Sequence, residues 1–319
     1  MKRASDEMGR AGDARDDVPG WLSEVVASAG FGGADWRRLS GGRTNQVWRL
    51  TWGTSQCAPF ATSAICKLYL PDGDTPLFPN DPWAEVAVLR ALADTGLSPH
   101  LLADLEHAGG RAILTEDAGP VWQGDEAEVM RRLRRLHMMP VPGGLARAPL
   151  RHVALTPGQL IAEAEGMLSE VERQSGAGAR AARRLRASRP GRPPIPTPDP
   201  EPCLLHGDPV AANLVGTAAP VLVDWQCPAL GDPVHDLSLV LSPSMRLAND
   251  RAPLTTGATR LLLQAYGSEE VATRYLALRP LLGYRLAAYA LWKSARGDAG
   301  YAPGVAAETA LMVQGVATS

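Results

Sequence analysis

The sequence has few aromatic residues and no strong excess of charge of either sign. Phe, Trp and Tyr make up 5% of the 319 residues, and the formal net charge is -2 at pH 7. A nearly neutral chain has no global field that would attract nucleic acid or an anionic membrane surface. We therefore expect no nucleic-acid partner and no membrane partner.

The chain also lacks the cysteine spacing of a zinc-binding or disulfide-rich protein. Its four cysteines include no Cys-x-x-Cys pair, which predicts reduced thiols. No apolar run approaches the ~18 residues that a membrane-spanning helix needs, and the charged N-terminus has no signal-peptide core. We expect a cytoplasmic protein with a disordered tail over residues 1–18.

The residues that follow this tail carry the patterns of a small lobe of strands and one main helix. Alternation over 47–52 and an apolar run over 64–70 predict two strands. Helical spacing predicts a helix over 83–95, and a short apolar stretch predicts a strand over 112–115. This order of elements predicts a small mixed α/β lobe over residues 19–118.

Beyond residue 118 the sequence patterns become mainly helical. The apolar spacing over 129–136 predicts an amphipathic helix. Thr156 and Pro157 are a cap and a first helical residue, and they predict a second helix that begins there. We therefore expect a larger, mostly helical lobe over residues 119–319, and an α+β fold for the chain as a whole.

One short window contains three oxygen-bearing side chains that could serve phosphoryl transfer. Four residues separate Asp208 from Asn213, and Asp224 follows the apolar strand predicted at 221–223. Phosphoryl transfer needs Mg²⁺ to neutralise phosphate charge, and a carboxylate that aligns the acceptor hydroxyl and takes its proton. Mg²⁺ prefers a few oxygen ligands, which indicates Asn213 and Asp224 for the metal and leaves Asp208 for the hydroxyl. The alternative is a pair of turns in which Asp and Asn bond their own backbone.

This window resembles the catalytic loop of the aminoglycoside phosphotransferase and choline/ethanolamine kinase superfamily, which is similar to protein kinases. The later run Gly-Asp-Pro-Val-His-Asp-Leu at 231–237 resembles the continuation of that loop in the same superfamily. The resemblance implies a bilobal protein-kinase-like fold with Asp208 as the catalytic aspartate and with Asn213 and Asp224 as Mg²⁺ ligands. It also implies that Asp236 is a buried partner of the catalytic loop.

Two further positions in the same window bear on its interpretation. His206 is expected to fix the loop by packing and hydrogen bonding, and not to move a proton. The run Pro209-Val210-Ala211-Ala212 departs from the more polar sequence of many superfamily members. That departure bears on the acceptor subclass more than on the activity.

The resemblance also implies a nucleotide site in the small lobe. Lys67 stands where a lysine would bind the phosphates, and Glu85 on the next helix would be its acidic partner. Gly41 and Gly42, with Asn45, resemble the loop that covers the phosphates in choline-kinase-like members. The alternative for these residues is an ordinary strand lysine, a surface glutamate and a plain turn.

The stretch after the strand predicted at 112–115 is expected to meet the adenine of the nucleotide. By resemblance Thr115, Glu116 and Asp117 belong to the hinge, where backbone groups contact the base. The cofactors implied by the whole pattern are ATP and Mg²⁺.

A late helix, expected over 281–296, is the candidate acceptor region. Its Tyr289 and Trp292 resemble the aromatic residues of a late helix in choline kinases, and aromatic faces attract quaternary ammonium groups. Aromatic residues at helical spacing are also common in cores, and three basic residues in the same segment would repel a cation. Choline-like amino alcohols, aminoglycosides and sugars therefore all stay open as acceptors.

Taken together, these patterns predict an ATP-dependent phosphotransferase that moves the γ-phosphate to a small-molecule hydroxyl by direct in-line transfer. A protein kinase is a weaker alternative, because the eleven residues between Asp224 and Asp236 leave no room for an activation segment. A nucleotide-binding pseudokinase that acts as a scaffold is another alternative. Against it, Lys67, Asp208 and Asp224 are all present.

Overall fold

The computed structural model divides into two compact units, and each unit is built from two separate stretches of the chain. The first comprises Met1–Gly73 and His100–Asp117, and the second comprises Asp74–Pro99 and Ala118–Ser319. The structure describes residues 18–39, 44–53, 62–145, 150–153, 156–174, 176–193 and 201–314. The tail predicted over residues 1–18 lies outside the described residues up to position 17. The lobe boundary predicted after residue 118 stays a prediction, and the structure adds that 74–99 packs with the second unit.

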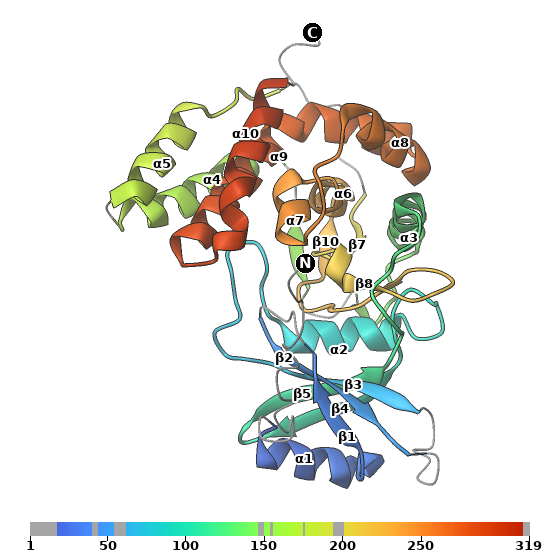
Figure 1. The fold of residues 1–319 in the computed structure, drawn as a ribbon. Helices are drawn as coiled ribbons and strands as arrows, with labels where there is room; N and C mark the ends of the chain where they lie inside the picture. The colour runs from blue at the N-terminus through green and yellow to red at the C-terminus, as the bar shows by residue number, and fades with distance from the viewer. Residues whose placement is uncertain are drawn as a thin grey trace, which may run out of the picture. The chain divides into compact units, whose positions relative to one another are not determined.

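A five-stranded antiparallel sheet forms the body of the first unit (Figure 1). Its strand order is β1-β2-β3-β5-β4, with every neighbouring pair antiparallel. The strands are β1 (Asp35–Arg38), β2 (Gln46–Thr51), β3 (Ser63–Leu68), β4 (Leu101–His107) and β5 (Gly110–Glu116). The three strands predicted from the sequence are β2, β3 and β5, while β1 and β4 are additional.

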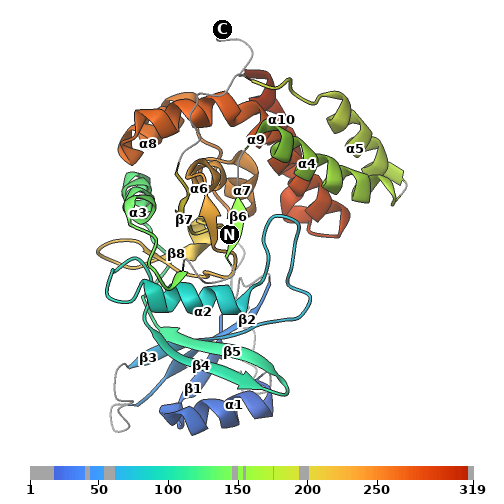
Figure 2. The ribbon, with the colours of Figure 1, turned by 180° about the vertical axis from the view of Figure 1, so that it is seen from behind.

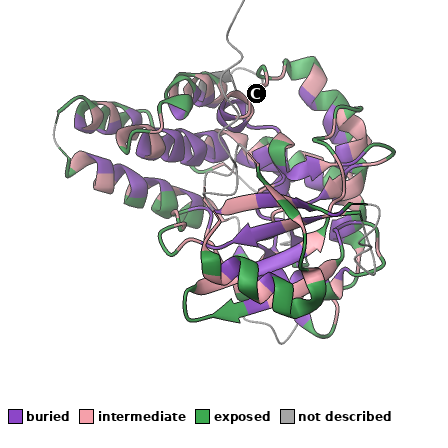
Figure 3. Ribbon diagram, turned by 60° about the horizontal axis from the view of Figure 1, so that its bottom comes forward, coloured by how far each residue is buried: buried purple, intermediate pink, exposed green. Residues whose placement is uncertain are grey.

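One helix completes the core of this unit. Helix α1 (Gly20–Val26) contributes the buried side chains of Leu22 and Val26, and a π-helical turn η1 (Ala27–Phe31) follows it. These side chains belong to the same buried cluster as Trp48 on β2. The inner strands of the sheet are more buried than β1, which is mostly exposed (Figure 3).

Helices make up most of the second unit, as the sequence predicts for the larger lobe. The two helices predicted at 129–136 and from Thr156 are confirmed, and Thr156 forms a capping box with Gln159. The helices are α2 (Pro82–Ala91), α3 (Glu126–Met138), α4 (Pro157–Glu172), α5 (Gly176–Ala187), α6 (Val234–Val240), α7 (Pro243–Ala248), α8 (Thr256–Tyr266), α9 (Glu269–Ala295) and α10 (Ala302–Gln314), with 3₁₀ turns η3 (Ala211–Asn213) and η4 (Ala299–Tyr301).

Helix α2 is shorter than the helix predicted over 83–95. It starts as expected, because Asp81 caps the backbone N–H groups of Trp83 and Ala84 and Pro82 occupies the first turn. It ends at Ala91, and Asp94 then adopts a positive φ of 65°. The apolar spacing therefore continues past the point where the backbone leaves the helix.

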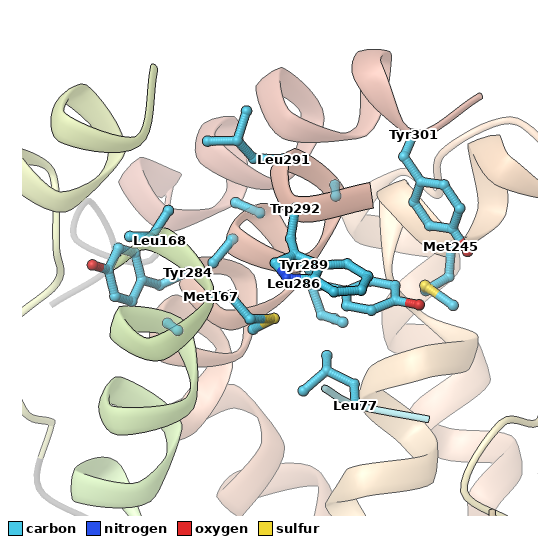
Figure 4. Close-up of a cluster of buried hydrophobic side chains, with 14 of the residues drawn as sticks. Leu77, Met167, Leu168, Met245, Tyr284, Leu286, Tyr289, Leu291, Trp292 and Tyr301 are labelled. Carbon is cyan, nitrogen blue, oxygen red and sulfur yellow. The ribbon is translucent and has the colours of Figure 1, made fainter. Parts of the chain in front are cut away.

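Helix α9 is the centre of the second unit. Helices α4 and α10 pack along it, and α5 packs against both α4 and α9 (Figure 2). The buried cluster around α9 includes Met167 and Leu168 from α4 and Tyr284 and Tyr289 from α9 (Figure 4). Among the described residues, no helix is both long enough and apolar enough to cross a membrane.

Short strands position the polar window within this helical unit. Strand β10 (Ala229–Gly231) pairs with β6 (Arg151–Val153) in parallel and with β7 (Cys203–Leu205) in antiparallel fashion. Strands β8 (Leu214–Val215) and β9 (Val221–Leu222) form a separate antiparallel pair. The predicted catalytic loop follows β7, Asp224 follows β9, and α6 follows β10, so these strands bring the three segments together.

Candidate active site

The loop that follows β7 requires a glycine at its second residue. Gly207 has a φ of +85°, and a Cβ atom placed on it would lie 2.0 Å from the carbonyl oxygen of Cys227. A side chain at position 207 would meet both backbone strain and a direct clash. The loop therefore passes against the segment around Cys227 by backbone contact.

Asp236 on α6 binds the backbone of this loop. Its two carboxylate oxygens accept hydrogen bonds from the N–H groups of His206 (2.8 Å) and Gly207 (2.9 Å), and its side chain is fully buried. His137 on α3 bonds the same carboxylate at 3.1 Å through Nε2. Burial alone would raise the pKa of Asp236, but the hydrogen bond from His137 and the nearby imidazoles outweigh burial and lower it to about 2.

His137 in turn contacts a tyrosine at the end of α8. Its Nδ1 lies 2.9 Å from the hydroxyl oxygen of Tyr266. Because the carboxylate of Asp236 can only accept, Nε2 of His137 donates to it, and Nδ1 shares the second hydrogen bond with Tyr266. Tyr266, His137 and Asp236 thus form a buried chain of hydrogen-bonded side chains that holds the catalytic loop.

His206 links the loop to the strand that precedes Asp224. Its Nδ1 accepts the N–H of Asp208 at 3.2 Å, which leaves the proton on Nε2 to be donated to the carbonyl of Val223 at 3.0 Å. The ring also packs on Trp225, with 4.4 Å between the ring centroids. These two hydrogen bonds connect the catalytic loop to Val223, and the expected loop-fixing role of His206 stays a prediction.

Asp208 carries one bound oxygen and one unpartnered oxygen. The amide of Asn213 donates to its backbone carbonyl at 2.9 Å and to its Oδ2 at 3.2 Å. Its Oδ1 is buried and has no hydrogen-bond partner among the described residues. Burial, followed by the negative charges of Asp224 and Asp236, raises the pKa of Asp208 to about 8, against the lowering effects of Asn213 and Arg151.

Asn213 comes just before β8 and Asp224 follows β9, so both residues stand at the open end of this antiparallel pair. The carbonyl of Asn213 accepts the N–H of Val223 at 3.0 Å, which brings Asp224 next to the catalytic loop. Asp224 has a positive φ of 62°, a conformation that non-glycine residues seldom adopt and that gathers at functional sites. The described residues hold no cluster of three or more His, Cys, Asp or Glu side chains suited to a metal.

The donor set nevertheless fits Mg²⁺. Mg²⁺ takes one or two carboxylates and keeps several waters. Asp208 and Asp224 are close enough for their charges to repel each other. Asn213 adds an amide oxygen beside them. A divalent cation would relieve the repulsion between these two carboxylates.

Each of the three residues after Asp224 has a backbone group in a hydrogen bond to another segment of the second unit. The N–H of Trp225 donates to Oε1 of Glu85 at 3.2 Å, and the carbonyl of Gln226 accepts the N–H of Asp81 at 2.9 Å. The carbonyl of Cys227 accepts from Nη2 of Arg151 at 3.1 Å. Glu85 is therefore a buried anchor of this loop within the second unit, and its predicted pairing with Lys67 stays a prediction.

The predicted nucleotide residues of the first unit lie on its sheet and next to it. Lys67 on β3 is buried, with its ammonium group 5.0 Å from the ring centroid of Tyr69. Oδ1 of Asn45 accepts the N–H of Leu70 at 3.0 Å. The predicted glycine pair, Gly41 and Gly42, lies outside the described residues.

The predicted hinge residues follow one another at the end of β5. Thr115 and Glu116 are its last two residues, and the N–H of Glu116 donates to the carbonyl of His100 at 2.9 Å. Asp117 pairs with Arg49 at 2.7 Å. The role of this segment in nucleotide binding stays a prediction.

The candidate acceptor residues on α9 are packed among other aromatic side chains. The rings of Tyr289 and Trp292 stack with 6.1 Å between centroids, and Phe78 meets Tyr289 edge-on at 5.1 Å. The guanidinium of Arg296 lies 3.7 Å from the ring centroid of Trp292. The hydroxyl of Tyr289 lies 3.3 Å from that of Thr75. The guanidinium of Arg296 thus already covers the ring face of Trp292.

Sequence reasoning missed three residues that contact this site: His137, Tyr266 and Arg151. A signal existed for His137, because it adjoins the apolar face of an otherwise arginine-rich helix, where a lone histidine is unusual. Tyr266 and Arg151 carry no such signal, since their contacts depend on how α8 and β6 pack.

Comparisons with known proteins indicate the family and the fold of the chain. A model of the phosphotransferase enzyme family matches residues 35–280. No curated protein sequence matches the chain significantly. Similar solved structures include a choline/ethanolamine kinase family protein from Mesorhizobium loti, with a TM-score of 0.56, 18% identity, and coverage of 90% of this chain and 89% of that chain.

Two further structures resemble the chain over nearly its full length. Choline kinase from Cryptosporidium parvum Iowa II has a TM-score of 0.55 and 15% identity, with 95% of this chain and 93% of that chain covered. A GDP complex of a variant of aminoglycoside 2′-phosphotransferase IIIa has a TM-score of 0.60 and 13% identity, with 93% and 98% covered. At these identities the likeness is one of fold, and it confirms the predicted kinase-like fold class.

Proposed function

Since the chain belongs to the phosphotransferase enzyme family, we propose that it transfers the γ-phosphate of ATP to a hydroxyl group of a small molecule. The observation that carries this proposal is the environment of Asp208. The backbone of its loop is fixed by hydrogen bonds to Asp236. Its Oδ2 accepts from Asn213, and its Oδ1 is left without a partner among the described residues. A rigidly held carboxylate with one available oxygen suits the alignment of an acceptor hydroxyl.

In the proposed reaction, Asp208 receives the proton of the acceptor hydroxyl as that oxygen attacks the γ-phosphorus. The new bond joins the acceptor oxygen to phosphorus, and the bond from phosphorus to the β,γ-bridging oxygen breaks, which releases ADP. Direct in-line transfer needs no phosphorylated enzyme intermediate. The protein's contribution is therefore orientation and charge.

Asn213 and Asp224 are the residues that would hold Mg²⁺. When bound, the metal would neutralise charge on the transferring phosphate. The hydrogen bonds on Trp225, Gln226 and Cys227 support this assignment, because they fix the backbone that follows Asp224.

For the nucleotide, we propose that Lys67 binds the phosphates and that residues Thr115, Glu116 and Asp117 meet the base. Lys67 is buried on a central strand, where a lysine without a function would be unusual. A likeness of fold to a structure with ADP and spectinomycin and to one with GDP supports nucleotide use. Glu85 supports this arrangement through the Asp224 loop.

The acceptor is proposed to be a small molecule that reaches Asp208 from the side of Tyr289. The charge of Asp208 contributes to the raised pKa of Tyr289, so the two groups lie within electrostatic range. Arg296 on the face of Trp292 favours an acceptor other than a quaternary ammonium, because a second cation would be repelled there. Choline is therefore a useful probe in the test and not the preferred acceptor.

The experiment is ATP consumption by purified protein with Mg²⁺ across choline, ethanolamine, other amino alcohols, aminoglycosides, macrolides and sugars. The Asp208→Asn variant is measured beside the wild type. Acceptor-dependent turnover that falls at least ~10²-fold in the variant would support the proposal. Turnover that survives the substitution would overturn the role of Asp208, and nucleotide binding without turnover on any acceptor would favour a scaffold.

A further inference from the structure

Arg151 is an arginine outside the predicted motifs that touches three segments of the candidate site. It is the first residue of β6, whose parallel pairing with β10 places Arg151 opposite Ala229. That register sets its side chain beside the segment just after Asp224. No pattern in the sequence marks this position, which makes its contacts informative.

Two of the contacts are hydrogen bonds to backbone carbonyl groups. Nη1 of Arg151 donates to the carbonyl of Leu77 at 3.2 Å, and Nη2 donates to the carbonyl of Cys227 at 3.1 Å. The planar, two-pronged guanidinium suits such a pair of acceptors, whereas a lysine ammonium is a single point charge. Arg151 thus joins two segments that are 150 residues apart in the chain.

The third contact is with the catalytic loop. Nη2 of Arg151 lies 3.3 Å from the place where a Cβ atom of Gly207 would stand. The guanidinium therefore lies beside the loop at the residue before Asp208 and limits the space for a side chain there. Its positive charge also acts against the burial that raises the pKa of Asp208.

The carbonyl of Leu77 belongs to a turn that faces the candidate acceptor side. Within this turn the N–H of Phe78 donates to the hydroxyl of Thr75 at 3.1 Å, and the hydroxyl of Thr75 also lies 3.3 Å from that of Tyr289. Leu77 itself lies near the rings of Tyr289 and Trp292 (Figure 4). The turn therefore connects Arg151 with the aromatic side chains of α9.

We propose that Arg151 is a positioning residue that couples this acceptor-side turn, residues 75–78, to the loop that carries Asp224. The proposal rests on the proposed function. The guanidinium binds the carbonyl groups of Cys227 and Leu77, and it thereby holds the acceptor and the phosphate-binding groups at a fixed distance and orientation. Without the two hydrogen bonds of the guanidinium, the two segments could move independently, and a displacement of about 1 Å can lower a rate ~10²-fold.

The kinetic test compares Arg151→Met and Arg151→Lys with wild type and with Arg186→Met. Arg186 on α5 pairs with Glu165 and Glu172 of α4, so its loss removes a structural ion-pair network outside the proposed site. We expect kcat to fall about 10²-fold in Arg151→Met with little change in nucleotide affinity, and Arg151→Lys to recover only part of it. Arg186→Met should keep the wild-type kcat.

Chemical rescue provides a second kinetic measurement. In Arg151→Ala the truncated side chain leaves space for a free guanidinium ion, which can reach both carbonyl groups. Millimolar guanidinium should raise the kcat of Arg151→Ala and leave Arg186→Ala unchanged. Equal responses of the two variants, or a loss of kcat in Arg151→Met no larger than its loss of folded protein, would overturn the proposal.

A readout without turnover separates this inference from the proposed function. The protein is labelled with 5-fluorotryptophan, and the ¹⁹F resonance of Trp225, in the loop after Asp224, is assigned from Trp225→Phe. We expect this resonance to shift or broaden in Arg151→Met and to stay in place in Arg186→Met. An unmoved resonance would overturn the coupling even in an active enzyme, whereas a moved resonance in a protein inactive on every acceptor would contradict the proposed function alone.

Discussion

Two aspartates in the second unit, the partly exposed Asp208 and the fully buried Asp236, have opposite environments. Asp236 accepts two backbone N–H groups and a histidine, and its pKa is lowered to about 2. Asp208 has one amide bond on its carboxylate and two like charges nearby, and its pKa is raised to about 8. Asp236 is the more buried of the two and still has the lower pKa, so the hydrogen-bond partners and neighbouring charges decide the difference.

The comparison teaches how one residue type can serve as a support or as a reactive group. A carboxylate whose lone pairs are all used by fixed donors contributes stability. A carboxylate left with an unused oxygen beside other negative charges is costly to the fold, and such groups gather at functional sites. Asp236 and Asp208 should therefore respond to the same substitution in different measurements.

The largest effect is expected for Asp236→Asn. The amide cannot accept from all three donors, and burial leaves at least one of them unpaired, so the free energy of unfolding should fall by about 3–5 kcal/mol. Urea denaturation measures this loss. Asp298→Asn, which breaks an ion pair with Lys293, is the control and should change stability by less than about 1 kcal/mol. A similarly small loss in Asp236→Asn would remove its role as the anchor.

Asp208→Asn should affect the rate and spare the fold. We expect kcat to fall at least ~10²-fold, equivalent to about 2.7 kcal/mol of activation free energy. The free energy of unfolding should stay the same or rise, because the substitution removes a carboxyl whose raised pKa destabilises the folded state at neutral pH. The comparison between the two aspartates would break if this variant lost stability as Asp236→Asn does.

His235, next to Asp236, should make the fold sensitive to mild acid. Burial, then the charges of Arg285 and Arg151, lowers its pKa to about 3 against the nearby charge of Asp236, so the unfolded state binds a proton first as pH falls. The stabilising contribution is complete above pH ~6.5 and is lost progressively towards pH ~3, by about 2 kcal/mol at pH ~5. Urea titrations at several pH values should show this slope in wild type and its loss in His235→Leu.

The exposed His152 provides the matched control for that measurement. His152→Leu removes a histidine from the same unit and should keep the wild-type slope. An equal slope in wild type and His235→Leu would mean that another group carries the acid sensitivity.

The smallest effect is expected for Tyr266→Phe, which removes the hydroxyl that forms a hydrogen bond with Nδ1 of His137. The free energy of unfolding should fall by about 1 kcal/mol. Because His137 acts on Asp236, the effect should shrink when Tyr266→Phe is combined with Asp236→Asn. Strict additivity of the two changes in denaturation experiments would separate Tyr266 from the support of the catalytic loop.

The sequence predicts those parts of the fold whose signals are local. The cap at Thr156 and the apolar face of α3 lie within single helices, and both predictions are confirmed. Strands β6 and β7 have three residues each and form only by pairing with a distant strand, so no local pattern marks them. The family and fold class could be predicted because Asp208, Asn213 and Asp224 lie within one short window.

The rest of the site depends on contacts between distant residues. His137 and Asp236 are 99 residues apart in the chain, and His137 and Tyr266 are 129 apart. Hydrogen bonds over such separations leave no periodic trace in a sequence. The roles of the predicted nucleotide and metal residues stay predictions, and the measurements above address Asp208 first.

The assembly of each unit from two separate stretches of the chain has a consequence for synthesis on the ribosome. Helix α2 emerges well before its packing partner, because Glu85 precedes the N–H of Trp225 by 140 residues. Strands β4 and β5, which complete the first sheet, emerge only after α2. The nascent chain must therefore carry α2 through 140 further residues of synthesis before Trp225 can bind Glu85.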